Sequence, residues 1–165
     1  MFQKGYFENS LTIIGSGLNE LTTDEFREKV KNAIQNNIEN SKEIDAFLKR
    51  LFYKQQDANS KDSYQKFLEM SLELDDKFDL KENRLFYLAM SPKFFGVATN
   101  HLKESGLTNV KGLMRIIIEK PFGDDLKSAK KLNNQISKSF KEEEIFGIGH
   151  YLSKEMIQNI ERLRF

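Results

Sequence analysis

The most constraining segment of this 165-residue chain is Met114–Glu119, whose sequence is MRIIIE. Its three consecutive isoleucines favour a β-strand, because β-branched side chains fit a pleated and half-buried surface. The run is almost continuously apolar and does not alternate with polar residues. Such a pattern is typical of strands that are buried on both faces of a parallel sheet. The segment therefore predicts a strand in an α/β protein.

Strand-like and helix-like patterns alternate along the rest of the chain. Further strands are predicted at Leu11–Ser16, from Phe52, at Arg84–Met90 and at Ile145–Ile148. Helical spacing of apolar residues predicts helices at 22–38, 44–51, 62–78, 92–105 and 126–140, and from about Lys154. Such alternation requires right-handed crossovers. We therefore expect an α/β fold with a doubly wound, Rossmann-like and mostly parallel sheet, helices on both faces, and ligands beyond the carboxyl ends of the strands.

Composition narrows the functional classes. The chain has 26 basic and 25 acidic residues, a balance that gives no electrostatic footprint for nucleic acid or an anionic membrane. No apolar run approaches the ~20 residues of a membrane span, so a cytoplasmic protein is expected. The absence of cysteine excludes disulfides and thiolate zinc sites. The two histidines, His101 and His150, lie far apart, and we expect no metal site.

The residues after the MRIIIE strand are candidates for ligand contact. Lys120 stands at the carboxyl end of that strand, where doubly wound sheets place ligand-binding groups. A cis conformation of Pro121 would aim this lysine into the crevice. The alternative is a solvated lysine that ends the strand before an ordinary proline turn, and the spacing alone favours that alternative.

A second candidate cluster lies at a predicted strand-to-helix junction. His150, Tyr151 and Lys154 can all donate hydrogen bonds to one phosphate, helped by the helix N-terminus. The alternative is a polar loop in which the tyrosine packs and the lysine is solvated. Considered together, Lys120 and this cluster make a plausible anion site at neighbouring strand ends.

The motifs of this chain resemble those of the glucose-6-phosphate dehydrogenase family. EKPFG at 119–123 matches a motif of the family, and HYLSKE at 150–155, with QN at 158–159 and LRF at 163–165, resembles its DHYLGKE…QN…LRF block. LTIIG, LTTDEF and RLFYLA also fit, Tyr53 and Asp57 fall in its Y-x-x-x-D turn, and Pro92 follows the preceding strand as in the family. The resemblance covers essentially the whole chain.

The resemblance implies an oxidoreductase of the pentose phosphate pathway that oxidises glucose 6-phosphate to the 6-phosphogluconolactone and passes hydride to NADP. Lys120 would contact both sugar and coenzyme, and Pro121 would be a cis proline beside the nicotinamide. His150, Tyr151 and Lys154 would hold the sugar phosphate. Tyr53 and Pro92 would border the coenzyme. Hydride transfer requires both reactants to be held in register.

The same resemblance implies that the chain is truncated at both ends. The family's first strand and its glycine-rich turn are absent, so we expect a Rossmann-like sheet that lacks its first strand. Residues 1–149 would be a partial NADP-binding domain, and residues 150–165 would begin the helix that leads into a missing C-terminal β+α domain. The general-base histidine lies in that domain. We therefore expect no catalytic residue in this chain, no activity alone, and a homodimer only for full-length family members.

Four positions depart from the family pattern, of which Ser153, in place of a glycine, is the mildest change. Leu18 replaces an arginine that reads the 2′-phosphate of NADP, so NAD is also a possible coenzyme. Gly149 replaces the aspartate that orients the histidine base, and Gly147 replaces an arginine. Gly15 and Gly17 do not substitute for the missing phosphate-binding turn, and we interpret them as a tight turn.

Two further hypotheses are kept. The chain could be a non-catalytic interaction or regulatory fragment that docks on a full-length dehydrogenase. Alternatively, it could be an oxidoreductase of the glucose–fructose oxidoreductase type, which also carries an E-K-P turn, although the HYLSKE block argues against that type.

Overall fold

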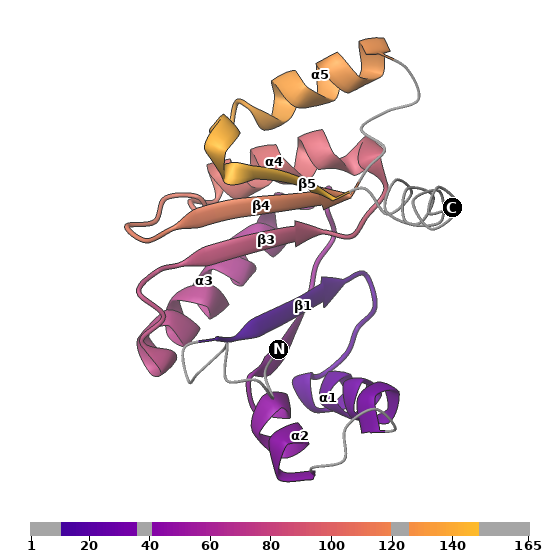
Figure 1. Cartoon of the computed structure of the whole chain (residues 1–165), viewed down its shortest axis with the longest axis vertical. Coiled ribbons are helices and arrows are strands. Elements are labelled where there is room, and N and C mark those ends of the chain that lie inside the picture. Colours follow the sequence, from indigo (N-terminus) through magenta and orange to yellow (C-terminus); the bar gives the residue numbers. More distant parts are fainter. Residues whose placement is uncertain (1–10, 36–40, 120–125, 149–165) are drawn as a thin grey trace, which may run out of the picture. The chain divides into compact units, whose positions relative to one another are not determined.

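The computed structural model describes residues 11–35, 41–119 and 126–148 (Figure 1). The chain divides into two compact units, Met1–Glu82 and Asn83–Phe165. The first unit holds a sheet of two strands, β1 (Ile13–Gly17) and β2 (Leu51–Gln55), and the second a sheet of three, in the order β3-β4-β5. All of these strand pairs are parallel. The parallel α/β architecture expected from the sequence is confirmed.

Helices cover both faces of the β1–β2 sheet. Successive residues of a strand point to opposite faces. Tyr53 packs on Phe26 of α1 (Thr23–Ile34), with ring centroids 5.4 Å apart, and Phe52 packs on Phe78 of α3 (Lys61–Phe78) at 6.0 Å. On the α1 side, α2 (Ser41–Leu48) completes a cluster of Ile44, Leu48 and Leu51.

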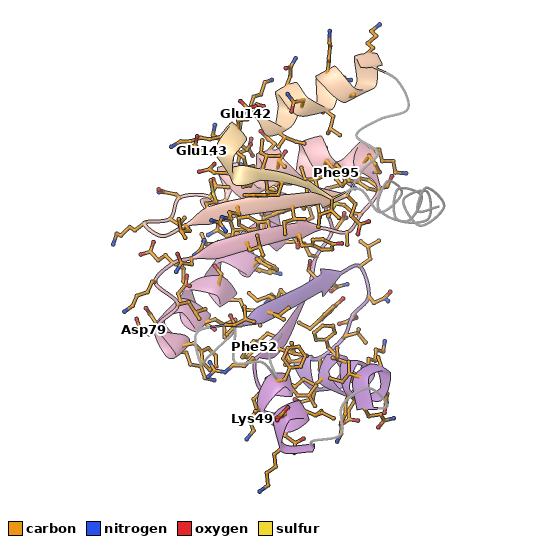
Figure 2. All side chains as sticks on the ribbon, in the orientation of Figure 1. Lys49, Phe52, Asp79, Phe95, Glu142 and Glu143 are labelled. Atoms are coloured by element: carbon orange, nitrogen blue, oxygen red, sulfur yellow. The ribbon has the colours of Figure 1, made fainter. Side chains whose placement is uncertain are left out.

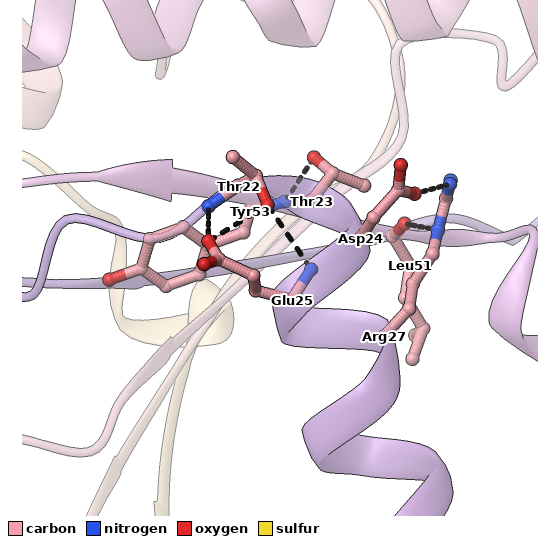
Figure 3. A network of polar contacts seen from close by, with 7 residues as sticks. All are labelled: Thr22, Thr23, Asp24, Glu25, Arg27, Leu51 and Tyr53. Atoms are coloured by element: carbon pink, nitrogen blue, oxygen red, sulfur yellow. Dashed lines mark hydrogen bonds and ion pairs between the residues drawn. The ribbon is translucent and has the colours of Figure 1, made fainter.

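The predicted capping box starts α1. The amide of Glu25 donates to the Thr22 hydroxyl at 3.2 Å, and the amide of Thr22 donates to the Glu25 carboxylate at 2.7 Å (Figure 3). The box satisfies two of the amides that a helix start leaves without partners. The same turn holds β2, because the amide of Tyr53 donates to the Thr23 hydroxyl at 3.2 Å.

The second unit begins with β3 (Arg84–Leu88) and a 3₁₀ turn at Pro92–Phe94, which leads into α4 (Phe95–Glu104). The chain leaves this helix through Gly106, whose φ of 87° is the expected left-handed stop. It continues through β4 (Met114–Glu119), α5 (Leu126–Ile136) and β5 (Ile145–Ile148). Phe95 is fully buried, whereas Glu142 and Glu143 project outward (Figure 2).

The expectation that β4 is buried on both faces is wrong. Ile116 and Ile118 are completely buried, but Arg115 on the other face is exposed and Ile117 is only partly covered. The reason lies in the order β3-β4-β5: both connections run the same way along the sheet. Right-handed crossovers therefore put α4 and α5 on one face. Within the described residues of this unit, that face alone is covered.

The interpretation of Gly15 and Gly17 as a tight turn is also wrong. Both residues belong to β1, and neither has a positive φ. Gly15 is required by close packing, because a Cβ atom there would lie 2.6 Å from the Cζ atom of Phe26. No helix in the described part of the chain is long and apolar enough to cross a membrane.

Candidate functional site

A pocket of about 520 Å³ lies at the carboxyl ends of β1 and β2. This is the edge at which parallel α/β sheets bind their ligands. Strand β1 ends at Gly17 and β2 at Gln55, and these two residues are register partners. The pocket is lined by Leu18, Lys54, Gln55, Asp57, Ser60, Asp62, Ser63 and Lys66.

Tyr53 shapes the turn that follows β1. Its ring is buried, and its hydroxyl donates to the Asn19 carbonyl at 2.7 Å. Gln55 adds a second support, since its side-chain amide donates to the Leu18 carbonyl at 2.9 Å. The sequence-predicted Tyr53 therefore holds the backbone of the turn at Asn19, and Gln55 holds it at Leu18.

The turn between β2 and α3 forms the opposite wall. The Asp57 carboxylate accepts the Asn59 amide at 2.9 Å, and the Ser63 hydroxyl donates to the Ser60 carbonyl at 2.7 Å. Tyr64 is buried beneath this turn, and its burial, together with the charge of Asp57, raises its pKa to about 12. The tyrosine therefore stays neutral at physiological pH.

The pocket carries charges of both signs. Lys54 and Lys66 make no ion pair within the described residues, and Asp57 and Asp62 supply two carboxylates. An ammonium group can contact phosphate oxygens, and a carboxylate can accept a ribose hydroxyl. Leu18 is 71% exposed at the rim and offers neither function. The arrangement is chemically suited to the sugar–phosphate part of a nucleotide.

In the second unit, a polar pair joins two strand ends. The Tyr87 hydroxyl at the end of β3 donates to the Glu119 carboxylate at the end of β4. This hydrogen bond raises the pKa of Tyr87, with smaller contributions from burial and from the charge of Glu119. Glu119 immediately precedes Lys120 in the sequence. The pair therefore fixes the strand end from which the predicted ligand-binding lysine follows.

Only some of the remaining predicted site residues lie in the described part of the chain. Pro92 is the first residue of the 3₁₀ turn after β3, and Gly147 is an exposed residue of β5. The others lie outside the described residues; they are Lys120, Pro121, Gly149, His150, Tyr151 and Lys154. In the described part of the chain, no group of histidine, aspartate and glutamate side chains is arranged to hold a metal ion.

Sequence reasoning missed Lys54, Lys66 and the Tyr87–Glu119 pair. The first two are ordinary polar positions of a strand and a helix, and only the fold brings them to one pocket. Glu119 had a signal, because it belongs to the same EKPFG motif as Lys120. Tyr87 had none beyond its place near the end of a strand.

Residues 1–159 match the family described as glucose-6-phosphate dehydrogenase, NAD binding domain. The chain belongs to this family. Glucose-6-phosphate 1-dehydrogenase of Bacillus subtilis is 39% identical over 165 residues, which cover 100% of this chain and 33% of the relative. The enzyme of Leuconostoc mesenteroides is 37% identical, over 100% of this chain and 34% of its own length. The chain thus spans about a third of these dehydrogenases.

Solved structures of the family share the fold. A glucose-6-phosphate dehydrogenase in complex with its substrate glucose-6-phosphate has a TM-score of 0.82 and 34% identity, over 96% of this chain and 33% of that one. The Mycobacterium avium enzyme has a TM-score of 0.73 and 27% identity, over 99% and 34%. The expected family and Rossmann-like fold are confirmed. An NAD binding domain identifies the cofactor class as a nicotinamide dinucleotide.

Proposed function

We propose that this chain is the coenzyme-binding part of a glucose-6-phosphate dehydrogenase. In the complete enzyme, hydride would pass from glucose 6-phosphate to the nicotinamide and leave the 6-phosphogluconolactone. The observation that carries the proposal is the match of residues 1–159 to a family described as an NAD binding domain. The pocket at the carboxyl ends of β1 and β2 supports it. Turnover would require the parts of the relatives that this chain does not span.

Each predicted residue has a role in this proposal. Lys120 would contact the sugar and the coenzyme, and Pro121 would lie beside the nicotinamide. The sugar phosphate would be held by His150, Tyr151 and Lys154, three donors within five residues. Pro92 would border the coenzyme. Tyr53 would act through the backbone of Asn19, since its hydroxyl is already engaged there.

The pocket at the carboxyl ends of β1 and β2, in the first unit, would hold the adenosine end of the coenzyme. Leu18, at the rim, cannot pair with a 2′-phosphate, so the chain would accept NAD as well as NADP. Two lysines of the pocket, Lys54 and Lys66, would supply the positive charge that contacts a phosphate of the coenzyme. Asp57 and Asp62 would favour the free ribose hydroxyl of NAD.

The proposal also includes the domain limits, the cellular location and the oligomeric state that the sequence led us to expect. Residues 1–149 would form the coenzyme-binding domain, and residues 150–165 would lead toward the rest of the enzyme. The protein would work in the cytoplasm, and dimerisation would belong to the full-length enzyme.

A paired assay tests the proposal. The purified chain and the Bacillus subtilis relative are each given glucose 6-phosphate with NADP or NAD, and reduced coenzyme is followed by absorbance. We expect turnover by the relative alone, while the chain binds coenzyme in a parallel titration. Turnover by the chain close to that of the relative would refute the need for the remaining parts. A folded chain that binds neither coenzyme would refute the coenzyme role.

A further inference from the structure

The pocket at the carboxyl ends of β1 and β2 lies on the α3 side of this two-stranded sheet. Tyr53 packs on α1, whereas Phe52 packs on Phe78 of α3. Because successive residues of a strand point to opposite faces, Lys54 shares the α3 face with Phe52. The lining residues agree with this, since several come from the start of α3 and its cap: Ser60, Asp62, Ser63 and Lys66. Lys54 therefore points to the face on which the pocket is built.

Lys54 is a cross-strand neighbour of the turn that follows β1. Its register partner is Ser16. The pairing continues past the strand ends, because the Gln56 amide donates to the Gly17 carbonyl at 2.8 Å. Leu18, two residues after Ser16, is therefore a diagonal neighbour of Lys54. Strand spacing puts such Cα atoms about 8 Å apart, a separation that a long side chain can span.

The backbone beside Lys54 is held in place. Gln55, the next residue of β2, donates its side-chain amide to the Leu18 carbonyl at 2.9 Å. The Tyr53 hydroxyl donates to the Asn19 carbonyl at 2.7 Å. Leu18 itself is 71% exposed and carries no charge. A positive charge at this turn must therefore come from a neighbouring side chain, and Lys54 is the diagonal neighbour that carries one.

The second lysine of the pocket, Lys66, is less well placed for selective binding. It lies four residues after Asp62 on α3, and an aspartate and a lysine at this spacing attract each other. It is also exposed, whereas Lys54 is half-buried on a paired strand. A side chain that is already partly ordered loses less conformational freedom when it binds a ligand. Of the two ammonium groups, that of Lys54 is therefore better suited to discriminate between ligands.

We propose that Lys54 selects the 2′-phosphate of NADP in this chain, at the turn where Leu18 replaces an arginine. The inference rests on the proposed binding of the coenzyme in this pocket. A phosphate monoester carries a charge of about −1.5 to −2 at pH 7, and the Lys54 ammonium supplies the opposite charge. The carboxylates of Asp57 and Asp62 line the same pocket and repel the phosphate. The preference for NADP is therefore modest, and NAD also binds.

A contact between Lys54 and the diphosphate of the coenzyme is the competing assignment. NAD and NADP share the diphosphate, so that contact strengthens the binding of both alike. The 2′-phosphate is present in NADP alone. The ratio of the two affinities therefore separates the two assignments, and measuring it requires no turnover.

Calorimetric titration of the full 165-residue chain with NADP and with NAD tests the inference. Lys54→Met keeps most of the length of the side chain and removes its charge. We expect it to weaken NADP binding about tenfold and to change NAD binding by less than about twofold. Lys54→Arg keeps the charge and should keep most of the preference for NADP. Adenosine 2′,5′-bisphosphate and 5′-AMP form a second pair of probes, which should show the same difference without the nicotinamide.

Asp62→Asn tests the same charge balance from the opposite direction. It removes a carboxylate from an exposed position in the first turn of α3 and should raise the affinity for NADP relative to NAD. Because this position is exposed, the variant also serves if Lys54→Met does not fold.

The matched control is Lys49→Met. Lys49 is exposed just before the start of β2, at the end of the strand opposite the pocket (Figure 2). The variant removes the same charge and should bind both coenzymes like the wild type.

The results that overturn the inference differ from the one that refutes the coenzyme role. An unchanged affinity ratio in Lys54→Met or in Asp62→Asn would contradict the charge balance, and equal weakening of NAD and NADP would place Lys54 on the diphosphate. A larger fall of the ratio in Lys66→Met would assign the phosphate to that lysine. Each of these results overturns the inference and leaves the coenzyme role intact. A folded wild-type chain that binds neither coenzyme would refute both.

Discussion

The hydroxyl of Tyr87 donates a hydrogen bond to the carboxylate of Glu119, and this bond joins the carboxyl ends of β3 and β4. Tyr87 is the register partner of Ile117, so Glu119 lies one pleat further along on the same face of the sheet. The next residue after Glu119 is Lys120, the lysine that we propose contacts the sugar and the coenzyme. A carboxylate held in this way limits the freedom of the backbone from which that lysine extends.

Glu119 should set the pKa of Tyr87. The carboxylate accepts a hydrogen bond from the protonated phenol and would repel the phenolate, so it raises the pKa of Tyr87. Glu119→Gln removes the negative charge and should lower the Tyr87 pKa toward its ordinary value. Nuclear magnetic resonance of ring-labelled tyrosine measures this titration. Glu142→Gln, at an exposed site, is the control. An unchanged Tyr87 pKa in Glu119→Gln would show that the bond is not formed in solution.

Gly15→Ala should destabilise the first unit. The new Cβ atom would lie 2.6 Å from the Cζ atom of Phe26, so the phenylalanine ring would have to move. Overpacking of this kind costs about 1–3 kcal/mol, measurable by urea unfolding. Gly17→Ala is a matched control in the same strand, because a Cβ atom there would lie 3.4 Å from the Tyr53 hydroxyl oxygen, which is ordinary contact. If both variants lose the same stability, the close packing of Phe26 is not the cause.

Thr22→Ala should weaken the start of α1. The substitution removes the acceptor of the Glu25 amide, and loss of such a cap costs about 1 kcal/mol. Chemical denaturation of the wild type and the variant gives the difference. Thr22→Ser keeps the hydroxyl and should recover most of the stability. Failure of serine to recover it would mean that the threonine methyl group, and not the cap, is responsible.

The same cap should make stability depend on pH. Hydrogen bonds from the Thr22 amide and hydroxyl lower the pKa of Glu25 below its ordinary value of 4.5. A lowered folded-state pKa contributes stability that is present above the unfolded-state pKa and is lost as pH falls through the folded-state value. The wild type should therefore exceed Glu25→Gln in stability at neutral pH, and the difference should shrink in acid below about pH 4. A difference that stays constant across this range contradicts the ionised cap. Glu28→Gln, on the same helix, is the control.

Leu18→Arg should change the coenzyme preference. An arginine at the rim of the pocket of the first unit can form a charge-assisted pair with a 2′-phosphate, which a leucine cannot. We expect affinity for NADP to rise about tenfold over affinity for NAD, measured by titration of both coenzymes. Leu113→Arg adds the same charge in the other unit and should leave the ratio unchanged. An unchanged ratio in Leu18→Arg would place the 2′-phosphate elsewhere.

Local signals in the sequence predicted most of the elements. The Thr22–Glu25 spacing marked the start of α1, and the isoleucines of β4 identified its strand, because both signals act within a few residues. What the sequence could not show depends on strand order. Arg115 is exposed and Ile117 is only partly covered because α4 and α5 both lie on the opposite face of the sheet. Lys54 and Leu18 meet at one pocket only because β1 and β2 pair in parallel register.

The exposure of the Leu85 and Tyr87 side chains could not be predicted from the sequence either. Leu85 and Tyr87 belong to an apolar, aromatic run that is typical of any strand, paired on one side or on two. Similarly, the role of Tyr53 in the turn after β1 depends on a carbonyl that lies 34 residues away in the chain. The family resemblance predicts that Tyr53 lies near the coenzyme, and the fold gives the contact with Asn19 through which it would act.

Calorimetric titration of the 165-residue chain, with NAD or NADP and separately with glucose 6-phosphate, tests the central proposal most directly. The account predicts saturable binding of the coenzyme and of the sugar phosphate without turnover. Binding of the sugar phosphate should be lost in Lys120→Ala and in Lys154→Ala. Lys111→Ala, in a described loop outside the proposed site, should bind like the wild type. A folded wild-type chain that binds neither glucose 6-phosphate nor a nicotinamide dinucleotide would contradict the account.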